Sequence, residues 1–140
     1  MFETFKRAAK TLVLALSLAA ANGCGVETVK PDDSARRLHH LVLIWLKQPG
    51  DAALRQRYID ESKALAELPG VLAYHMGTPA AVRRGRASKA VDDSYDVAIA
   101  GVFESRQAFE AFLNHPEYLR VAQQVLRPLV ESYRVYDFVE

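Results

Sequence analysis

The sequence predicts one α+β domain with elements in the order β-α-β-β-α-β, the ferredoxin-like arrangement, and a four-stranded antiparallel sheet. Two unbroken apolar runs, at residues 41–46 and 97–103, indicate strands that are buried on both faces. A Pro-Gly pair at 69–70 and an Asn-His-Pro sequence at 114–116 mark the ends of helical patterns. A chain of 140 residues, half of them hydrophobic, can hold one such domain and little more.

The first half of the domain is expected to form a strand, a helix and a second strand. Residues 41–46 (LVLIWL) are too short a run for a helix and are followed by Lys-Gln-Pro-Gly. Asp51 can cap the next helix by accepting hydrogen bonds from its first backbone N–H groups. Apolar residues recur along that helix at spacings of three and four: Leu54, Tyr58, Ile59, Leu65 and Leu68. The Pro-Gly pair ends the helix, and residues 71–78 form the second strand.

A polar loop at residues 79–94 leads to the third strand, which is expected at residues 95–104. Ser105 is a suitable cap for the helix that follows. The spacing of the apolar residues in this helix predicts that three side chains are buried: Phe109, Phe112 and Leu113.

A further helix is expected from Glu117, because the proline of the Asn-His-Pro break suits a first helical turn. Five of its apolar residues should point inward: Leu119, Ala122, Val125, Leu126 and Leu129. Arg127-Pro128 should kink or end this helix, because a proline lacks the backbone N–H that the helix needs. Residues 132–139 then form the last strand.

The two most apolar strands, the first and the third, are those that this topology places at the centre of the sheet. One layer of helices covers one face of the sheet, and the chain has no element left for the other. A second copy of the chain, packed sheet against sheet, is the economical cover, so the sequence predicts a homodimer. Because side chains alternate along a strand, either Leu43 or Ile44 should face the partner and the other the helices.

The N-terminal 23 residues are expected to be a secretory signal peptide. Basic residues at 6, 7 and 10 precede an apolar run at 11–21 that is too short to span a bilayer as a permanent helix. The sequence Asn-Gly-Cys-Gly at 22–25 then resembles the bacterial lipobox, which implies a lipid on Cys24. The protein would be anchored on the periplasmic side of the cell envelope. The alternative is cleavage near residues 19–21, which would leave it periplasmic with Cys24 as a free thiol.

Residues 24–38 lack apolar periodicity and are expected to form a flexible tether before a domain at residues 39–140. The whole chain has a formal charge of +1; Lys6, Arg7 and Lys10 against Glu3 give the predicted signal peptide +2, which leaves −1 for the remainder. Nothing in this charge distribution indicates a nucleic-acid partner.

No Cys, His and carboxylate pattern has metal-ligand spacing, and no glycine-rich loop follows a strand, so no cofactor is predicted. His39 and His40 are adjacent in a strand, so their rings point to opposite faces and cannot chelate one ion together. The basic residues of the 79–94 loop (Arg83, Arg84, Arg86 and Lys89) could meet an anionic ligand or lipid headgroups, but a solvated loop is the preferred interpretation. Trp45 is expected to pack in the core.

The sequence LNHPEY at 113–118, together with His40-Leu41-Val42 at the start of the first strand, resembles the Dabb family, the stress-responsive dimeric α/β-barrel proteins. The resemblance covers roughly residues 39–139. It implies a dimeric α/β barrel and a stress-related role. Members of this family range from enzymes to proteins with no known activity.

In cyclase members of the family, the proposed catalytic tyrosine and histidine flank the His-Pro break. The matching positions here are Phe112 and Tyr118, so that acid–base pair is absent. Whether the chain is an enzyme stays open, and we expect binding rather than turnover.

A small apolar cleft between the helices and the sheet is the predicted ligand site. The residues expected to line it are two histidines and three aromatic residues: His40, Tyr74, Phe112, His115 and Tyr118. This mixture suits a small, mostly hydrophobic ligand with one polar group. For His115 we favour the alternative that its ring hydrogen-bonds backbone groups at the helix junction. The alternative functions are an enzyme that uses His40 and Tyr118 on a small hydrophobic carbonyl compound, and a haem-handling or oxygenase-like protein.

Overall fold

The computed structural model describes residues 35–140. The predicted signal peptide, Cys24 and the tether up to residue 34 lie outside the described residues. The elements are, in chain order, β1 (Leu38–Leu46), α1 (Ala52–Ser62), a 3-10 turn (Lys63–Glu67), β2 (Val71–Gly77), β3 (Val97–Phe103), α2 (Arg106–Leu113), α3 (Pro116–Leu119), a π-helical segment (Arg120–Leu126), a 3-10 turn (Arg127–Leu129) and β4 (Val130–Val139).

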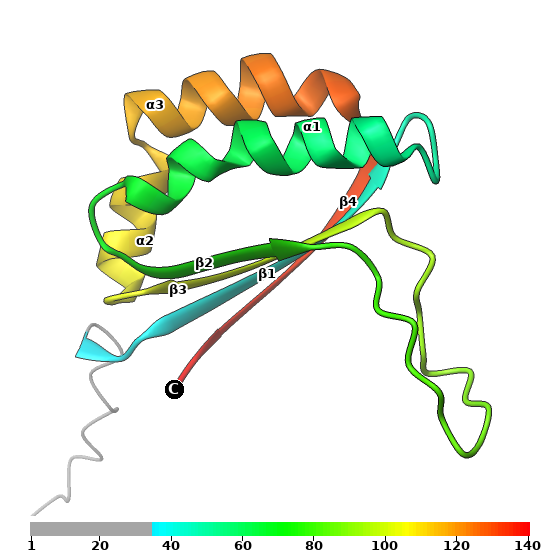
Figure 1. Cartoon of the computed structure of the whole chain (residues 1–140). Coiled ribbons are helices and arrows are strands. Elements are labelled where there is room, and N and C mark those ends of the chain that lie inside the picture. Colours follow the sequence, from blue (N-terminus) through cyan, green and yellow to red (C-terminus); the bar gives the residue numbers. More distant parts are fainter. Residues whose placement is uncertain (1–34) are drawn as a thin grey trace, which may run out of the picture.

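The four strands form one antiparallel sheet in the order β2-β3-β1-β4, so β1 and β3 occupy its centre. All the helices of residues 35–140 lie on one face of this sheet, and no helix of this described part covers the opposite face (Figure 1). This is the predicted ferredoxin-like fold, with both apolar runs in the central strands.

Side chains alternate along β1 between the helical layer and the open face of the sheet. Val42, Ile44 and Leu46 are buried beneath the helices, and only 1% of Ile44 is exposed. Leu41, Leu43 and Trp45 point to the other face and are half-buried. Ile44 is therefore the residue that faces the helices, and Leu43 belongs to the face that the helices leave open.

We call this second surface the outer face; it carries apolar side chains of β1 and β4 that no described element covers. Leu41 of β1 lies opposite Tyr136 of β4, which is 49% exposed. Phe138, two residues further along, is 57% exposed and stacks on His39, with ring centroids 4.6 Å apart. Trp45 lies on this face rather than in the core, because its place in β1 has the same parity as Leu41 and Leu43.

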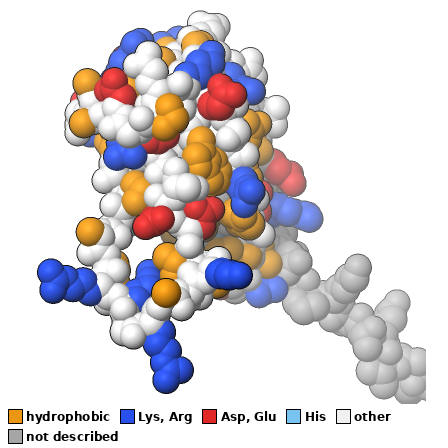
Figure 2. Space-filling model, turned by 90° about the vertical axis from the view of Figure 1, so that its right-hand side faces the viewer, with side chains coloured by type: hydrophobic (Ala, Val, Ile, Leu, Met, Phe, Trp, Pro, Cys, Tyr) orange, Lys and Arg blue, Asp and Glu red, His pale blue; other side chains and the backbone are white. Residues whose placement is uncertain are grey.

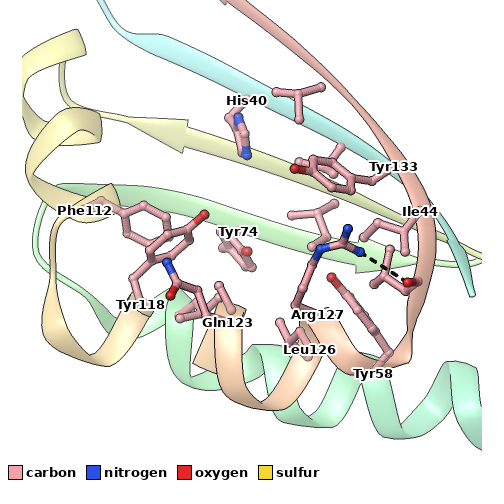
Figure 3. A pocket seen from close by; sticks show the side chains of 16 residues that line it. His40, Ile44, Tyr58, Tyr74, Phe112, Tyr118, Gln123, Leu126, Arg127 and Tyr133 are labelled. Carbon is pink, nitrogen blue, oxygen red and sulfur yellow. Dashed lines mark hydrogen bonds between the residues drawn. The ribbon is translucent and has the colours of Figure 1, made fainter. Parts of the chain in front are cut away.

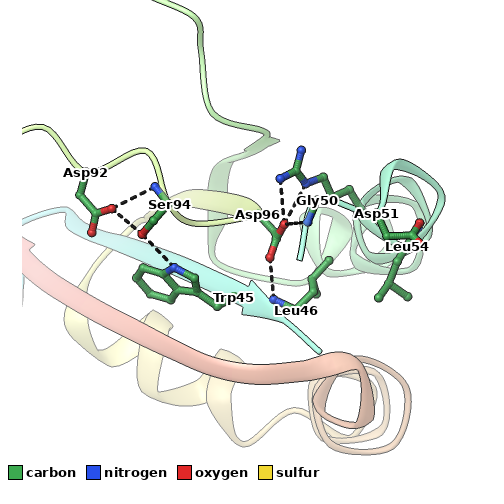
Figure 4. Close-up of polar contacts among 9 residues, drawn as sticks. Trp45, Leu46, Gly50, Asp51, Leu54, Asp92, Ser94 and Asp96 are labelled. Atoms are coloured by element: carbon green, nitrogen blue, oxygen red, sulfur yellow. Dashed lines mark hydrogen bonds and ion pairs between the residues drawn. The ribbon is translucent and has the colours of Figure 1, made fainter. Parts of the chain in front are cut away.

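A buried aspartate joins the ends of three elements. The Asp96 side chain is 1% exposed and accepts hydrogen bonds from the backbone N–H groups of Leu46 (2.9 Å) and Gly50 (2.8 Å), as Figure 4 shows. Arg55 of α1 donates two more, at 2.8 and 3.0 Å. Burial by itself raises the pKa of the Asp96 carboxyl, but these hydrogen bonds and the charge of Arg55 outweigh it and lower the pKa.

Both predicted helix caps are present. Asp51 accepts a hydrogen bond from the Leu54 N–H at 2.8 Å, and Ser105 accepts one from the Ala108 N–H at 3.1 Å. The capped helices α1 and α2 supply Tyr58, Phe109 and Phe112 to the core.

The sequence interpretation was also wrong at the start of β1 and in the last helix. β1 begins at Leu38, which is buried, so the last residue of the predicted tether belongs to the sheet. The helix predicted from Glu117 turns after one α-helical turn into a π-helix, which buries Val121 and Leu126 and leaves Leu119 38% exposed. Val121 and Leu126 are five residues apart, the spacing that an i→i+5 turn brings to one side.

Candidate ligand cavity

A cavity of about 540 Å³ lies between the sheet and the helices, a size that suits a small organic ligand. Figure 3 shows side chains from β1, β2, α1, β4 and the segment after the His-Pro break converging on it. It is lined by His40, Val42, Ile44, Tyr58, Leu65, Tyr74, Ile99, Phe112, Tyr118, Ala122, Gln123, Leu126, Arg127, Val130, Tyr133 and Val135.

Four of the five residues predicted for the ligand site line this cavity: His40, Tyr74, Phe112 and Tyr118. Phe112 is the link between two of them, because its ring centroid lies 4.8 Å from that of Tyr118 and 6.4 Å from that of Tyr74. The fold thus brings these residues together from four different elements. That they bind a ligand stays a prediction.

His115 does not line the cavity, which corrects its place in the predicted site. Its Nδ1 accepts a hydrogen bond from the Glu117 N–H at 3.2 Å, and it stands directly before Pro116, the first residue of α3. The imidazole therefore satisfies a backbone group at the start of the helix, as the preferred interpretation of this residue held.

His40 has a partner that the sequence did not reveal. Its Nδ1 lies 2.6 Å from Oδ1 of Asp137, which sits opposite it on β4. In the tautomer whose Nδ1–H donates to the carboxylate, Nε2 is left as an acceptor. The ring also packs on Phe109, with centroids 4.8 Å apart. Asp137 could be found only through the register of β4 against β1, which depends on contacts between distant parts of the chain.

Three tyrosines supply neutral hydroxyl groups to the cavity wall. Burial raises the pKa of Tyr58, Tyr74 and Tyr118 above the usual value, and neighbouring phenols raise it further. At neutral pH these groups therefore keep their protons and can donate hydrogen bonds to a carbonyl or carboxylate oxygen.

The π-helical segment and the turn after it contribute Gln123, Leu126 and Arg127 to the cavity. The Arg127 guanidinium donates to the Val130 carbonyl at 3.2 Å and lies 5.6 Å from the centroid of the Tyr133 ring. Sequence reasoning missed Arg127 as a site residue, because the Arg-Pro pair was interpreted only as the end of a helix. A local π-helix is a frequent feature of functional sites.

The other candidates lie elsewhere. The basic residues of the loop between β2 and β3 are exposed, and Figure 2 shows Lys and Arg side chains projecting where this loop leaves the domain. Trp45 Nε1 donates to Ser94 at 3.1 Å on the outer face, away from the cavity. Within residues 35–140, no three His, Cys, Asp or Glu side chains could hold a metal ion, and no helix is long and apolar enough to cross a membrane.

Residues 38–140 match the sequence pattern of the Stress responsive A/B Barrel Domain. The chain belongs to the Dabb family. Among solved structures, it is similar to a Dabb family protein with a ferredoxin-like fold from Mesorhizobium loti, at 21% identity and a TM-score of 0.60 over 75% of this chain and 97% of that one. No curated protein is significantly similar to it in sequence.

Two further structures show how varied proteins with this fold are. A dimeric ferredoxin-like protein of unknown function from Thermobifida fusca is 18% identical, with a TM-score of 0.59 over 79% of this chain and 97% of that one. The hydroxynitrile lyase of Passiflora edulis is 20% identical, with a TM-score of 0.60 over 76% of this chain and 94% of that one. At these identities the likeness establishes the Dabb fold and leaves the activity of this chain unassigned.

Proposed function

We propose that this Dabb domain binds a small, mostly apolar ligand with one polar group in the cavity between its sheet and its helices. The observation that supports this most is the composition of the cavity wall. Apolar and aromatic side chains form most of it, while His40, Tyr58, Tyr74 and Tyr118 add a few polar atoms that keep their hydrogen-bonding capacity.

A second candidate is an enzyme that acts on a small hydrophobic carbonyl compound. The His40–Asp137 pair favours it, because a carboxylate that orients an imidazole is a common arrangement for a general base. The fold shared with a hydroxynitrile lyase agrees with this candidate. Binding remains our first proposal, because the acid–base pair of the cyclases is absent: its two positions hold Phe112 and Tyr118 in this chain. A Soret band in the purified protein would instead favour the haem alternative.

His40→Ala and Tyr118→Phe are each expected to weaken binding of the neutral probe 2-naphthamide about three- to tenfold, the value of one lost hydrogen bond. The amide group of this probe can donate to Nε2 of His40 and can accept from the Tyr118 hydroxyl. Tyr95→Phe, which removes a phenol outside this cavity, is the matched control and should bind like the wild type. Isothermal titration calorimetry gives the affinities, and circular dichroism checks the fold. Wild-type affinity in both cavity variants would contradict the proposed site, and conversion of the probe would favour the enzyme.

We also propose that two copies of the chain pack through their outer faces as a homodimer. The exposed rings of Tyr136 and Phe138, beside the half-buried Leu41 and Leu43, support this proposal. Monomeric proteins rarely leave such a continuous apolar surface in water. The Thermobifida fusca protein, which has the same fold, is described as dimeric.

We further propose that the protein is exported and attached to the cell envelope by a lipid on Cys24, after removal of residues 1–23. In a bacterial host that processes lipoproteins, the wild type should fractionate with membranes and Cys24→Ser should become soluble. Immunoblotting of the fractions and mass spectrometry of the mature N-terminus check this. A wild-type protein that is already soluble, with an unmodified cysteine, would show that lipidation is wrong.

A further inference from the structure

We infer that the ligand of this cavity is an organic carboxylate whose charged group sits on Arg127 and whose apolar body lies against the aromatic side chains. This deepens the proposed function and rests on it. Of the 16 residues that line the cavity, Arg127 is the one with a permanent charge, and none is an aspartate or glutamate.

The guanidinium of Arg127 has N–H groups left that can donate to a ligand. It carries five N–H groups in a planar fork, and its hydrogen bond to the Val130 carbonyl uses one of them. In Figure 3 it lies toward the end of the cavity away from Phe112 and Tyr118, between Tyr58 and Tyr133. A carboxylate can bind such a fork with two parallel hydrogen bonds, which a neutral amide cannot match.

The other polar end of the cavity does not favour an anion. His40 is already paired with the carboxylate of Asp137, at 2.6 Å, and a second carboxylate there would face that negative charge. The ligand is therefore oriented, with its anionic group at Arg127 and its ring toward Phe112 and Tyr118.

Two features of its surroundings make the binding of an anion in the cavity depend on Arg127. It stands at the C-terminal end of the π-helical segment, where backbone carbonyls carry partial negative charge and would repel an anion if the guanidinium were absent. Arg127 is also exposed, so a carboxylate bound to it keeps contact with water and avoids most of the cost of burying a charge.

The test uses two probes of almost the same shape, 2-naphthoate and its neutral analogue 2-naphthamide, titrated calorimetrically into the full chain. The wild type should bind the carboxylate roughly tenfold more tightly than the amide, as expected for a charge-assisted hydrogen bond at a partly exposed site. Arg127→Gln should abolish or reverse this preference while leaving the affinity for the amide unchanged. Arg127→Lys, which keeps the positive charge but not the planar fork of donors, should keep part of the preference for the carboxylate.

Arg120→Gln is the control, because it removes a positive charge from the same segment outside the cavity. It should keep the full preference for the carboxylate. Equal affinity of the wild type for both probes, or a preference that survives Arg127→Gln, would overturn this inference and leave the binding proposal intact. Failure of both probes to bind the wild type would overturn the binding proposal itself. Retained affinity for the amide shows that a variant is folded.

Discussion

Leu41→Glu is expected to convert the dimer into a folded monomer. Leu41 points to the outer face and lies between Ala100 on β3 and Tyr136 on β4, so neither residue directly opposite it carries a charge that could pair with the new carboxylate. Burying an unpaired charge in the interface should cost at least about 3 kcal/mol, roughly a hundredfold in the dissociation constant. In the separated subunit the same side chain is solvated, so the fold should survive.

Neighbouring positions on β1 serve as controls for this result. Leu43→Glu should weaken the dimer less, because Arg134 lies directly opposite on β4 and can pair with the glutamate. Ile44→Glu should instead unfold the subunit, because Ile44 is 1% exposed beneath the helices. Sedimentation equilibrium and circular dichroism separate the three outcomes. A Leu41→Glu variant that stays dimeric and folded would refute the packing of outer face on outer face.

Asp96→Ala is expected to destabilise the subunit by about 3 kcal/mol or more, the second large effect. The substitution leaves the backbone N–H groups of Leu46 and Gly50 without the acceptor that Asp96 provides, and it removes the partner of Arg55. Arg55 keeps 28% of its side chain exposed, so its charge can reach water and the loss should fall near the lower end of the range for broken buried pairs. Urea unfolding measures the change. Asp92→Ala, at an exposed carboxylate, should leave the midpoint unchanged.

The same aspartate should leave a signature in the pH dependence of stability. Its pKa in the folded chain lies below the value of about 3.9 in an unfolded chain, so its contribution is fully present above roughly pH 4. It is lost as the pH falls through the lower pKa of the folded state. The difference in unfolding free energy between the wild type and Asp96→Asn should therefore shrink on acidification. A difference that stays constant down to pH values near 2 would contradict this role.

Local sequence patterns were sufficient for the fold. The apolar runs of β1 and β3, the caps at Asp51 and Ser105, and the Asn-His-Pro break each depend on residues that are close in the chain. Hydrophobic pattern, capping and turn residues all favoured the same β-α-β-β-α-β order, and that agreement explains why the prediction was confirmed.

The candidate site was only partly predictable. His40, Tyr74, Phe112 and Tyr118 could be chosen by residue type and by their places at strand and helix ends. Asp137 could not be chosen in this way, because it lies 97 residues from His40 in the chain and their contact follows from the register of β4 against β1. Arg127 was missed because no single-sequence pattern distinguishes a π-helical turn from an α-helical one, and that turn decides which side chains reach the cavity.

The most direct test of the central claim, that two copies each hold one small ligand between sheet and helices, is native mass spectrometry of the full chain with saturating 2-naphthoate. We expect a dimer with two bound probe molecules, and a monomer with one bound molecule for Leu41→Glu. A wild-type monomer would contradict the dimer. A dimer that remains without ligand at saturating 2-naphthoate, and also at saturating 2-naphthamide, would contradict the cavity as a binding site.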